Sequence, residues 1–380
     1  MNNPQTKQKS RHKILWLIKD HEQISRADLA KLTGLTRPTV SSIIADFVDN
    51  KIVVESGKGK SGGGKRPIML QLNPDACFAI GIDLGDDYLI RGVLCDLCGN
   101  VVAREDLEYE NDFETILRVL EKLIALLAAS VPREKIKGVG VAVSGIVDTE
   151  SNEVVNSSTL DIEKKQLAKR LAQRCQFNVF LENRPNAAAL AETQFGAGKN
   201  FRNLIYITSG RGVGAGIVIN GKIFRGSFGT AGEIGEIRLP IAKEGGGFER
   251  LHLEDLTRAS AVCKQVEKIK KHPVHYNEIM KAYRNDDAEI CAIMNQNAEH
   301  MAYAAQIIAN VLNPEAIILG GRAVELGDKY LRTFRAYFES GLAKALIGGL
   351  TVVSYSQYGH LGVAIGGAVV VLDLVMDQKI

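Results

Sequence analysis

Two short helical patterns joined by a Thr-Gly turn, between Ser25 and Asn50, constrain this chain more than any other feature. Ser25 is a typical helix N-cap, and Gly34 stands where the first helix must end in a left-handed conformation. Thr36 predicts a second N-cap, and Pro38 is tolerated only within the first turn of the helix that follows. Apolar residues at helical spacing predict one buried face on each of these helices and on a preceding one: Ile14, Leu15, Leu17, Ile18, Leu29, Ala30, Leu32, Val40, Ile43, Ile44, Phe47 and Val48. The pattern predicts a helix-turn-helix.

The second helix of such a motif presents its N-terminal end to the major groove of DNA. The candidate base contacts at that end are polar residues, namely Thr36, Arg37, Thr39 and Ser42. Residues 52–72 then predict two strands around a Gly- and Lys-rich tip, the wing of a winged helix. The candidate phosphate contacts on the wing are Lys58, Lys60, Lys65 and Arg66. A charged loop alone indicates a solvated surface, but its place directly after a helix-turn-helix favours DNA binding.

Charge is divided unevenly along the 380 residues. Residues 1–72 carry 13 Lys and Arg against 6 Asp and Glu, whereas the remainder carries 34 against 38. The N-terminal end, which includes Lys7, Lys9 and Arg11, is therefore suited to nucleic acid, and the bulk of the chain is not.

A hydrophobic fraction of 46% over this length is enough for two or three domains. No run approaches the ~18 consecutive apolar residues of a membrane span, and the N-terminus lacks the apolar core of a secretion signal. We therefore expect a cytoplasmic protein. Six scattered Cys do not form a disulfide framework. Cys95 and Cys98, beside Asp96 and Gly99, are expected in a hairpin rather than at a metal or redox site.

From about residue 77 the chain alternates strand and helix patterns. The first series has strands at 78–85, 89–97 and 100–108, a helix at 113–130, strands at 137–145 and 178–183, and a helix at 185–198. The second series has two strands within 204–221, a helical middle at 255–312, a strand at 316–321, a helix at 328–346, a strand at 352–356 and a terminal helix. The similar openings at 78 and 204 predict two similar lobes around a cleft.

Four motifs, in this order and behind a winged helix, make the chain similar to the ROK family of repressors, open reading frames and sugar kinases. They are GIDLG (81–85), ENRPNAAALAE (182–192), GVGAGIVINGKIFRGSFGTAGEIGE (212–236) and VLNPEAIILGG (311–321). The chain resembles the repressor branch, such as xylose repressors, over nearly its whole length. The resemblance implies an α/β fold with two actin-like (ribonuclease-H-like) lobes, a sugar site in the cleft and, in kinase members, ATP beside it. The implied domains are 1–72 for the winged helix, 73–184 with 357–380 for the first lobe, and 185–356 for the second lobe.

Sugar phosphorylation needs a general base, a phosphate cradle and usually Mg²⁺. The base of the family's kinases resembles an Asp directly after the Glu-Asn pair, and here Arg184 stands at that position with a guanidinium that stays protonated. Asp86 and Asp87 replace the small residue and the hydroxyl residue of the first phosphate-binding turn. In the second phosphate-binding turn, the long side chain of Arg211 replaces a small hydroxyl residue. The strand at 316–321 resembles the adenosine-side motif, although packing explains it as well. We therefore expect no kinase activity and no ATP site.

The zinc motif that the family resemblance implies is also altered. Family members typically carry a His at the end of GEIGH and a Cys cluster a few residues later. This chain has Glu236 at the His position, and residues 243–255 contain no Cys. His252 alone cannot hold a structural zinc ion. We expect no metal or other cofactor, and a 243–255 loop that is either ordered by other means or mobile.

A sugar-binding pocket is what the resemblance leaves. Matched positions imply that Asn183, Glu233 and Glu254 bind sugar hydroxyls and that Ser144 and Gly145 form the facing turn; Arg184 and Glu236 complete the candidate ligand-binding set. A surface or helix-capping role is the alternative for each Glu. Arg184 and Arg211 raise the hypothesis that the effector is anionic, such as a sugar phosphate or sugar acid. The competing explanation is that Arg184 pairs internally with Glu182 or Glu233 and closes an empty pocket.

The sequence thus favours a DNA-binding repressor of carbohydrate-related genes. We expect a homodimer or homotetramer on an inverted-repeat operator in double-stranded DNA, with a sugar or sugar-phosphate effector in the cleft and no membrane partner. One alternative is a sugar kinase with an appended DNA-binding head. Another is a DNA-binding protein whose lobes serve only oligomerisation.

Overall fold

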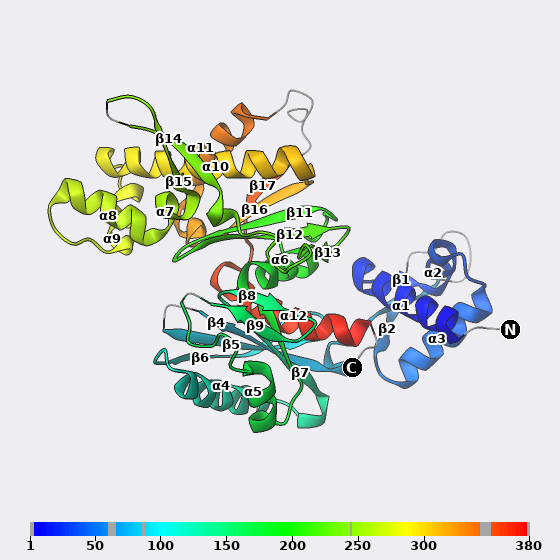
Figure 1. Ribbon diagram of the computed structural model, residues 1–380. Coiled ribbons are helices and arrows are strands. Elements are labelled where there is room, and N and C mark those ends of the chain that lie inside the picture. The colour runs from blue at the N-terminus through cyan, green and yellow to red at the C-terminus, as the bar shows by residue number, and fades with distance from the viewer. Residues whose placement is uncertain are drawn as a thin grey trace.

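The computed structural model describes residues 4–59, 66–85, 88–157, 159–243, 245–342 and 351–377. Figure 1 shows a small N-terminal head beside two stacked α/β lobes, with the end of the C-terminal helix lying next to the head. The predicted α/β fold with two actin-like lobes behind a winged helix-turn-helix is confirmed.

The head contains three helices and a small sheet of order β1-β3-β2. Its elements are α1 (Pro4–His21), β1 (Ile24–Ser25), α2 (Arg26–Thr33), α3 (Arg37–Asp49), β2 (Val53–Lys58) and β3 (Ile68–Leu72). Both predicted caps of α2 form: the Ser25 side chain accepts from the N–H of Asp28, and Gly34 ends the helix with φ 72°. The predicted buried face of α2 was wrong at Leu32, whose surface is 47% exposed, because no element of the head covers that side of the helix.

The first lobe is built on a five-stranded sheet of order β10-β7-β4-β5-β6. Its strands are β4 (Phe78–Leu84), β5 (Leu89–Asp96), β6 (Val101–Glu108), β7 (Ile136–Val143) and β10 (Val179–Asn183). The amphipathic α4 (Phe113–Ala128) buries its apolar face against one side of this sheet, together with α5 (Leu167–Cys175). The sequence patterns did not predict α5 or the short hairpin of β8 (Ile146–Asp148) and β9 (Glu153–Asn156).

The second lobe repeats this arrangement with the order β13-β12-β11-β16-β17. Its strands are β11 (Leu204–Ser209), β12 (Val213–Ile219), β13 (Lys222–Ile223), β16 (Ala316–Gly321) and β17 (Val352–Tyr355). Its helices are α7 (Leu253–Thr257), α8 (Ala259–Lys270), α9 (Tyr276–Arg284), α10 (Ala288–Leu312) and α11 (Gly327–Ser340). In both sheets an antiparallel opening pair is followed by two parallel strands, so the expectation of two similar lobes is confirmed.

Two helices cross between the lobes. Helix α6 (Arg184–Phe195) follows the last strand of the first sheet but packs against β11 and β12 of the second. Helix α12 (Gly362–Met376) follows the last strand of the second sheet but packs against β4 and β7 of the first. The two helices touch each other so closely that a Cβ at Gly366 would lie 1.8 Å from the Ala187 carbonyl oxygen.

The segment Gly359–Met376 is long and apolar enough to cross a membrane by length and composition, which the search for unbroken apolar runs did not detect. Most of α12 is nevertheless buried between the sheet of the first lobe and α6. Its apolar character is therefore explained by burial in the protein core.

Cys95 and Cys98 lie where the hairpin was expected, at the turn between β5 and β6. The buried Asp96 carboxylate accepts from the N–H of Cys98 at 2.8 Å, and Gly99 turns the chain with φ 81°. Burial raises the pKa of Cys95 to about 12 and that of Cys98 to about 11. Both thiols are therefore poor nucleophiles at neutral pH.

Candidate DNA-binding and effector sites

The start of α3 is the outward-facing end of the helix-turn-helix. Arg37, Thr39 and Ser42 are all exposed there, whereas Val40 and Ile43 point into the head. The Thr36 hydroxyl accepts from the N–H of Thr39 at 3.4 Å and shares a hydrogen bond with its hydroxyl at 2.8 Å. Thr36 therefore fixes the first turn, and part of the hydrogen-bonding capacity of Thr39 is used within the protein.

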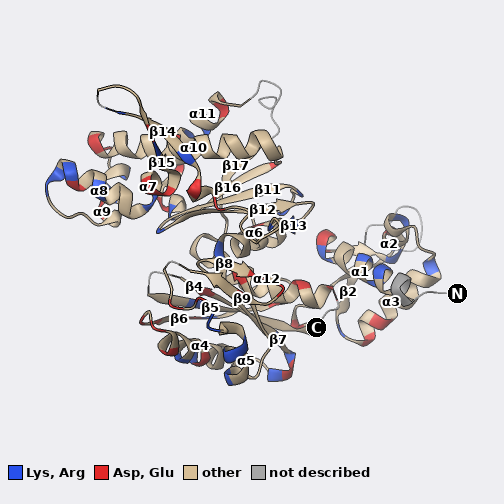
Figure 2. Ribbon diagram, in the orientation of Figure 1, with Lys and Arg blue, Asp and Glu red and all other residues tan. Residues whose placement is uncertain are grey.

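Figure 2 shows Lys and Arg recurring along the helices of the head. Some of the head's cations are exposed on the wing, and at least one is paired inside the head. Lys58 ends β2 and Arg66 precedes β3, and both are exposed. Lys60 and Lys65 lie outside the described residues. Arg11 instead pairs with Asp46 and lies over the Phe47 ring, 4.7 Å from its centroid. Arg11 thus joins α1 to α3 inside the head.

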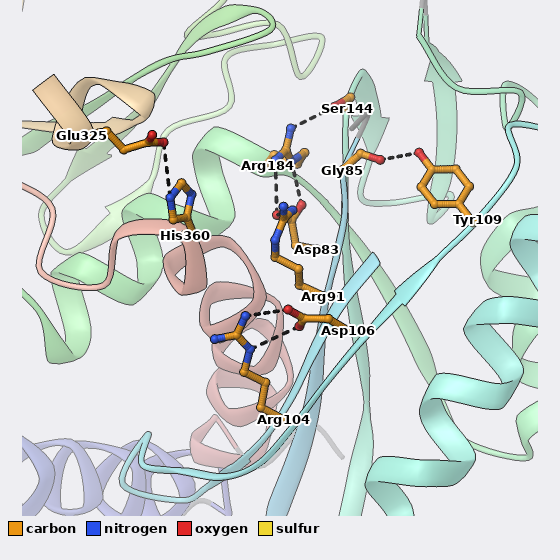
Figure 3. Close-up of polar contacts among 10 residues, drawn as sticks. All are labelled: Asp83, Gly85, Arg91, Arg104, Asp106, Tyr109, Ser144, Arg184, Glu325 and His360. Atoms are coloured by element: carbon orange, nitrogen blue, oxygen red, sulfur yellow. Dashed lines mark hydrogen bonds and ion pairs between the residues drawn. The ribbon is translucent and has the colours of Figure 1, made fainter. Parts of the chain in front are cut away.

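The first lobe gathers three polar side chains at one edge of its sheet. The parallel strands β4, β7 and β10 end side by side, which brings together Asp83, Ser144 and Arg184 (Figure 3). Arg184 Nε donates to Asp83 Oδ1 at 2.7 Å, and its Nη2 donates to Oδ2 at 3.2 Å. Its Nη1 also reaches the Ser144 hydroxyl oxygen at 3.4 Å. The fork of the guanidinium therefore covers an Asp83 side chain that is only 2% exposed.

Arg184 is thus paired internally, but with a partner that the sequence analysis did not name. The suggested partners, Glu182 and Glu233, were wrong. Glu182 is buried and pairs with Arg225, and it also accepts from the Asn186 side chain at 3.1 Å. No hydrogen bond or ion pair recorded among the described residues joins Arg184 to Glu233.

Asn183 and Gly145 lie together beside this pair. The Asn183 amide donates to the Gly145 carbonyl oxygen at 2.7 Å, so the side chain holds the turn after β7. Gly145 has φ 131°, and a Cβ there would lie 2.2 Å from the Asn156 carbonyl oxygen. Only glycine allows this turn to pass so close to the β8–β9 hairpin.

The second lobe contributes three carboxylates. Glu254 Oε2 accepts from the N–H of Val213 at 3.2 Å, and Glu254 Oε1 accepts from Arg258 at 3.3 Å. Glu233 stands at the start of a short turn next to Glu236 and Glu254. Its pKa is raised by partial burial and then by the charges of these two neighbours. The three carboxylates therefore form one group, whereas Ser144, Gly145, Asn183 and Arg184 form another on the first lobe.

Glu236, at the position of the family's zinc-binding His, lies with its Oε2 3.0 Å from His252 Nδ1. Arg238 Nε donates to His252 Nε2 at 3.1 Å, which assigns the remaining proton to Nδ1. The segment is ordered by a hairpin of β14 (Arg238–Ala242) and β15 (Phe248–His252). These residues do not fit the implied zinc ion: within the described ranges no group of three or more His, Cys, Asp or Glu side chains could hold a metal ion.

Residues of the region that resembles the nucleotide site make contacts with other parts of the protein. The Arg211 guanidinium lies 5.6 Å from the centroid of the Tyr88 ring, while Asp86 and Asp87 lie outside the described residues. A Cβ at Gly320 would collide with the Tyr206 ring, and Gly321 turns with φ 62°. Packing therefore explains the glycines of this motif.

Two features had no signal in the sequence. A cavity of about 1210 Å³ lies between the head and the lobes, lined by α1, α6, α12 and the β8–β9 turn, rather than at the expected sugar site. Glu192 on α6 is fully buried and accepts from Ser356 at 2.6 Å and from the N–H groups of Ala197 and Tyr358 at 2.8 and 3.1 Å. It ties the end of α6 to the segment that leads into α12.

The architecture defines a class of protein: a winged-helix DNA-binding head attached to the two lobes of an actin-like sugar kinase fold. Residues 7–54 match the winged helix-turn-helix DNA-binding family, and residues 79–374 match the ROK family. The chain belongs to the ROK family.

Individual relatives include both regulators and an enzyme. The chain is 32% identical to a xylose repressor of Caldicellulosiruptor bescii over 88% of each protein. A ROK family transcriptional regulator, described as a homologue of the E. coli MLC protein, superimposes with a TM-score of 0.82 over 98% of this chain and 97% of its own, at 22% identity. A ROK family glucokinase from Streptomyces griseus, in complex with glucose and AMPPNP, gives a TM-score of 0.68 over 77% of this chain and 98% of its own, at 25% identity.

Proposed function

We propose that this protein is a cytoplasmic transcriptional repressor of carbohydrate genes, with a head that binds an operator and lobes that bind a sugar effector. In this proposal residues 1–72 are the DNA-binding domain, residues 73–184 with 357–380 form the first lobe, and residues 185–356 form the second. The observation that carries the proposal is the exposed, capped start of α3 on a chain that matches a named repressor over 88% of its length.

The proposal excludes sugar phosphorylation. A kinase of this fold needs a proton acceptor beside the sugar hydroxyl, and Arg184 stands at the position of the family's base. Its guanidinium remains protonated and is held against Asp83 at 2.7 Å, so the pair offers neither a base nor an open carboxylate for Mg²⁺. An assay of ADP release with D-xylose and D-glucose tests this point, and turnover above a no-sugar control contradicts it.

The effector that fits this site is a neutral sugar. Asp83 is shared between Arg184 and Arg91, whose Nη1 lies 3.8 Å from Asp83 Oδ2, and an anionic effector at Arg184 would have to displace this buried bidentate partner. The carboxylates of Glu233, Glu236 and Glu254 on the facing lobe would also repel an anion. They are suited to accept hydrogen bonds from sugar hydroxyls. The name of the relative makes D-xylose the first compound to test.

A symmetric homodimer or homotetramer would present two heads to an inverted repeat, with half-sites about one helical turn or a multiple of it apart. Base contacts would come from Arg37, Thr39 and Ser42, and phosphate contacts from the wing cations. The sugar would change operator affinity only through its different affinity for two arrangements of the lobes.

The deciding experiment is fluorescence anisotropy of the full chain on DNA from its own upstream region, against a scrambled duplex of equal length. Each duplex is titrated with and without D-xylose, D-glucose and D-glucose 6-phosphate. The proposal expects selective binding that a neutral sugar shifts. Selective binding that none of the three compounds shifts would favour lobes that serve only oligomerisation. A shift by D-glucose 6-phosphate alone would support the hypothesis of an anionic effector. Equal binding to both duplexes would contradict the proposal that the head binds a specific operator.

A further inference from the structure

A half-buried lysine lies where the head meets the lobes. Lys19, near the end of α1, donates to the side-chain oxygen of Gln194 on α6. The Gln194 amide in turn donates to both carboxylate oxygens of Asp373 on α12, at 2.6 and 2.7 Å. Three helices from separate parts of the sequence are thus joined in one polar chain.

Two aromatic rings enclose this lysine. Its Nζ lies 4.5 Å from the ring centroid of Trp16 and 4.8 Å from that of Phe195. Burial lowers the pKa of Lys19, although Asp373 and Asp20 act in the opposite direction. The contact differs from the pairs around it, Glu22 with Lys199 and His12 with Asp377, which are more exposed to solvent. Exposed pairs of this kind contribute little.

The two helices that hold Lys19 both lead to the interlobe region. Helix α6 begins with Arg184, in the Asp83 site, and ends beside Gln194. Helix α12 follows His360, which pairs with Glu325 of the second lobe at 3.3 Å. Because α6 packs mainly on the second sheet and α12 on the first, the contact of Gln194 with Asp373 spans the junction between the two lobes.

The head also has room to move. The cavity of about 1210 Å³ lies directly beside this contact and is lined by Trp16, Lys19, Gln194, Phe195 and Asp373 among others. A densely packed junction would hold the head by shape alone. Here apolar packing of the head against the first lobe is combined with a polar contact beside open space.

We propose that the Lys19–Gln194–Asp373 contact couples the arrangement of the two lobes to the orientation of the DNA-binding head. Lys19 is a positioning residue in this scheme and touches neither DNA nor sugar. The inference rests on the proposed function, since it assigns the regulatory route between the sugar site and the operator.

The test compares Lys19→Met with Lys13→Met in the full chain. Methionine keeps an unbranched stem between Trp16 and Phe195 but removes the charge and the donor. Lys13 is exposed on the same helix, so its substitution controls for the loss of a positive charge from the head. Gln194→Met removes the residue that links Lys19 to Asp373. It provides a second variant should Lys19→Met fold poorly.

The first measurement needs no sugar. Operator affinity is measured by anisotropy on the native site and on a site with one base pair inserted between the half-sites. We expect wild type and Lys13→Met to lose about tenfold or more on the inserted site, because fixed heads match one spacing. Lys19→Met and Gln194→Met should lose less than about threefold, because their heads reorient. Equal discrimination in all four proteins would overturn the proposal.

The second measurement uses D-xylose. Calorimetry should give Lys19→Met the wild-type dissociation constant for D-xylose, while the change in operator affinity caused by the sugar falls by about fivefold or more. A full sugar response in Lys19→Met would contradict the coupling. If D-xylose does not bind wild type, the assignment of that sugar fails, whereas the spacing measurement still decides the role of Lys19.

Discussion

Two arginines of this chain, Arg37 on the head and Arg184 on the first lobe, have opposite surroundings. Arg37 begins α3 with its side chain exposed to solvent. Arg184 begins α6 at an equivalent place in its helix, directly after the N-cap, but lies across Asp83 with two hydrogen bonds. An arginine at a helix start is therefore available to a partner molecule only where the fold does not supply a carboxylate of its own.

The largest effect should come from removing Arg184, the arginine paired inside the first lobe. Arg184→Met leaves Asp83, 2% exposed, without its bidentate partner, and we expect the free energy of unfolding to fall by roughly 3 kcal/mol. Urea unfolding measures the loss. The double variant Asp83→Asn/Arg184→Met should recover part of it, because the buried carboxylate is gone while Arg91, 3.8 Å from Asp83 Oδ2 in the wild type, keeps its charge. A loss below about 0.5 kcal/mol would mean that water reaches the carboxylate.

Removing Arg37, the exposed arginine of the head, should leave the fold intact and affect DNA selectivity. Arg37→Ala is expected to change the free energy of unfolding by less than about 0.5 kcal/mol. The preference for operator over scrambled DNA should fall by roughly 1–3 kcal/mol, as for the loss of one good base contact. Calorimetry with D-xylose should be unchanged. Retained selectivity in the anisotropy assay would show that another element reads the bases.

A smaller effect separates phosphate contacts from base contacts on the same head. Lys58→Ala should weaken binding to operator and scrambled DNA equally and reduce the slope of log affinity against log salt by about 1. Arg104→Ala is the matched control, because Arg104 lies on the first lobe and pairs with Asp106 at 2.6 Å. A change in selectivity, or the same slope change in the control, would argue against a phosphate contact.

The smallest effect concerns Glu233, whose pKa is raised above 4.5 by partial burial and by Glu236 and Glu254. A carboxyl group with a raised pKa binds its proton more tightly in the folded state, so stability falls as pH rises from 4.5 through the folded pKa. Glu233→Gln should therefore raise the melting temperature slightly at pH 7 and leave it unchanged at pH 4. Glu249→Gln, on the exposed β15, should show no such difference. An equal shift at both pH values would exclude the electrostatic cause.

The sequence predicts the local features of this molecule well, because they depend on neighbouring residues. Ser25, Gly34 and Thr36 cap the helices as their types require, and the opening pair of strands in the first lobe follows from two mainly apolar runs separated by a short polar segment. Burial is less local: Leu32 has the right spacing for the core, but nothing in the head covers it.

The internal partner of Arg184 could not be read from the sequence because Asp83 is 101 positions away. The two side chains meet only because β4 and β10 both pair with β7 and end at one edge. Glu182, nearer in sequence, points instead to Arg225. The contact of Lys19 with Gln194 and Asp373 depends on three separate segments, and no spacing rule links them. The roles of the sugar-site residues remain predictions.

The exchange of α6 and α12 between the lobes also has a consequence for synthesis of the chain. The sheet of the first lobe needs α12 to cover β4 and β7, yet α12 comes last, about 280 positions after β4 begins. While the ribosome extends the chain, one apolar face of a largely formed sheet stays exposed until α12 has been synthesised. Exposed apolar surface of this kind leads nascent chains to aggregate or to recruit chaperones. A protein truncated before Gly362 would keep the complete head and most of both lobes, but its first lobe would lack one side of its core.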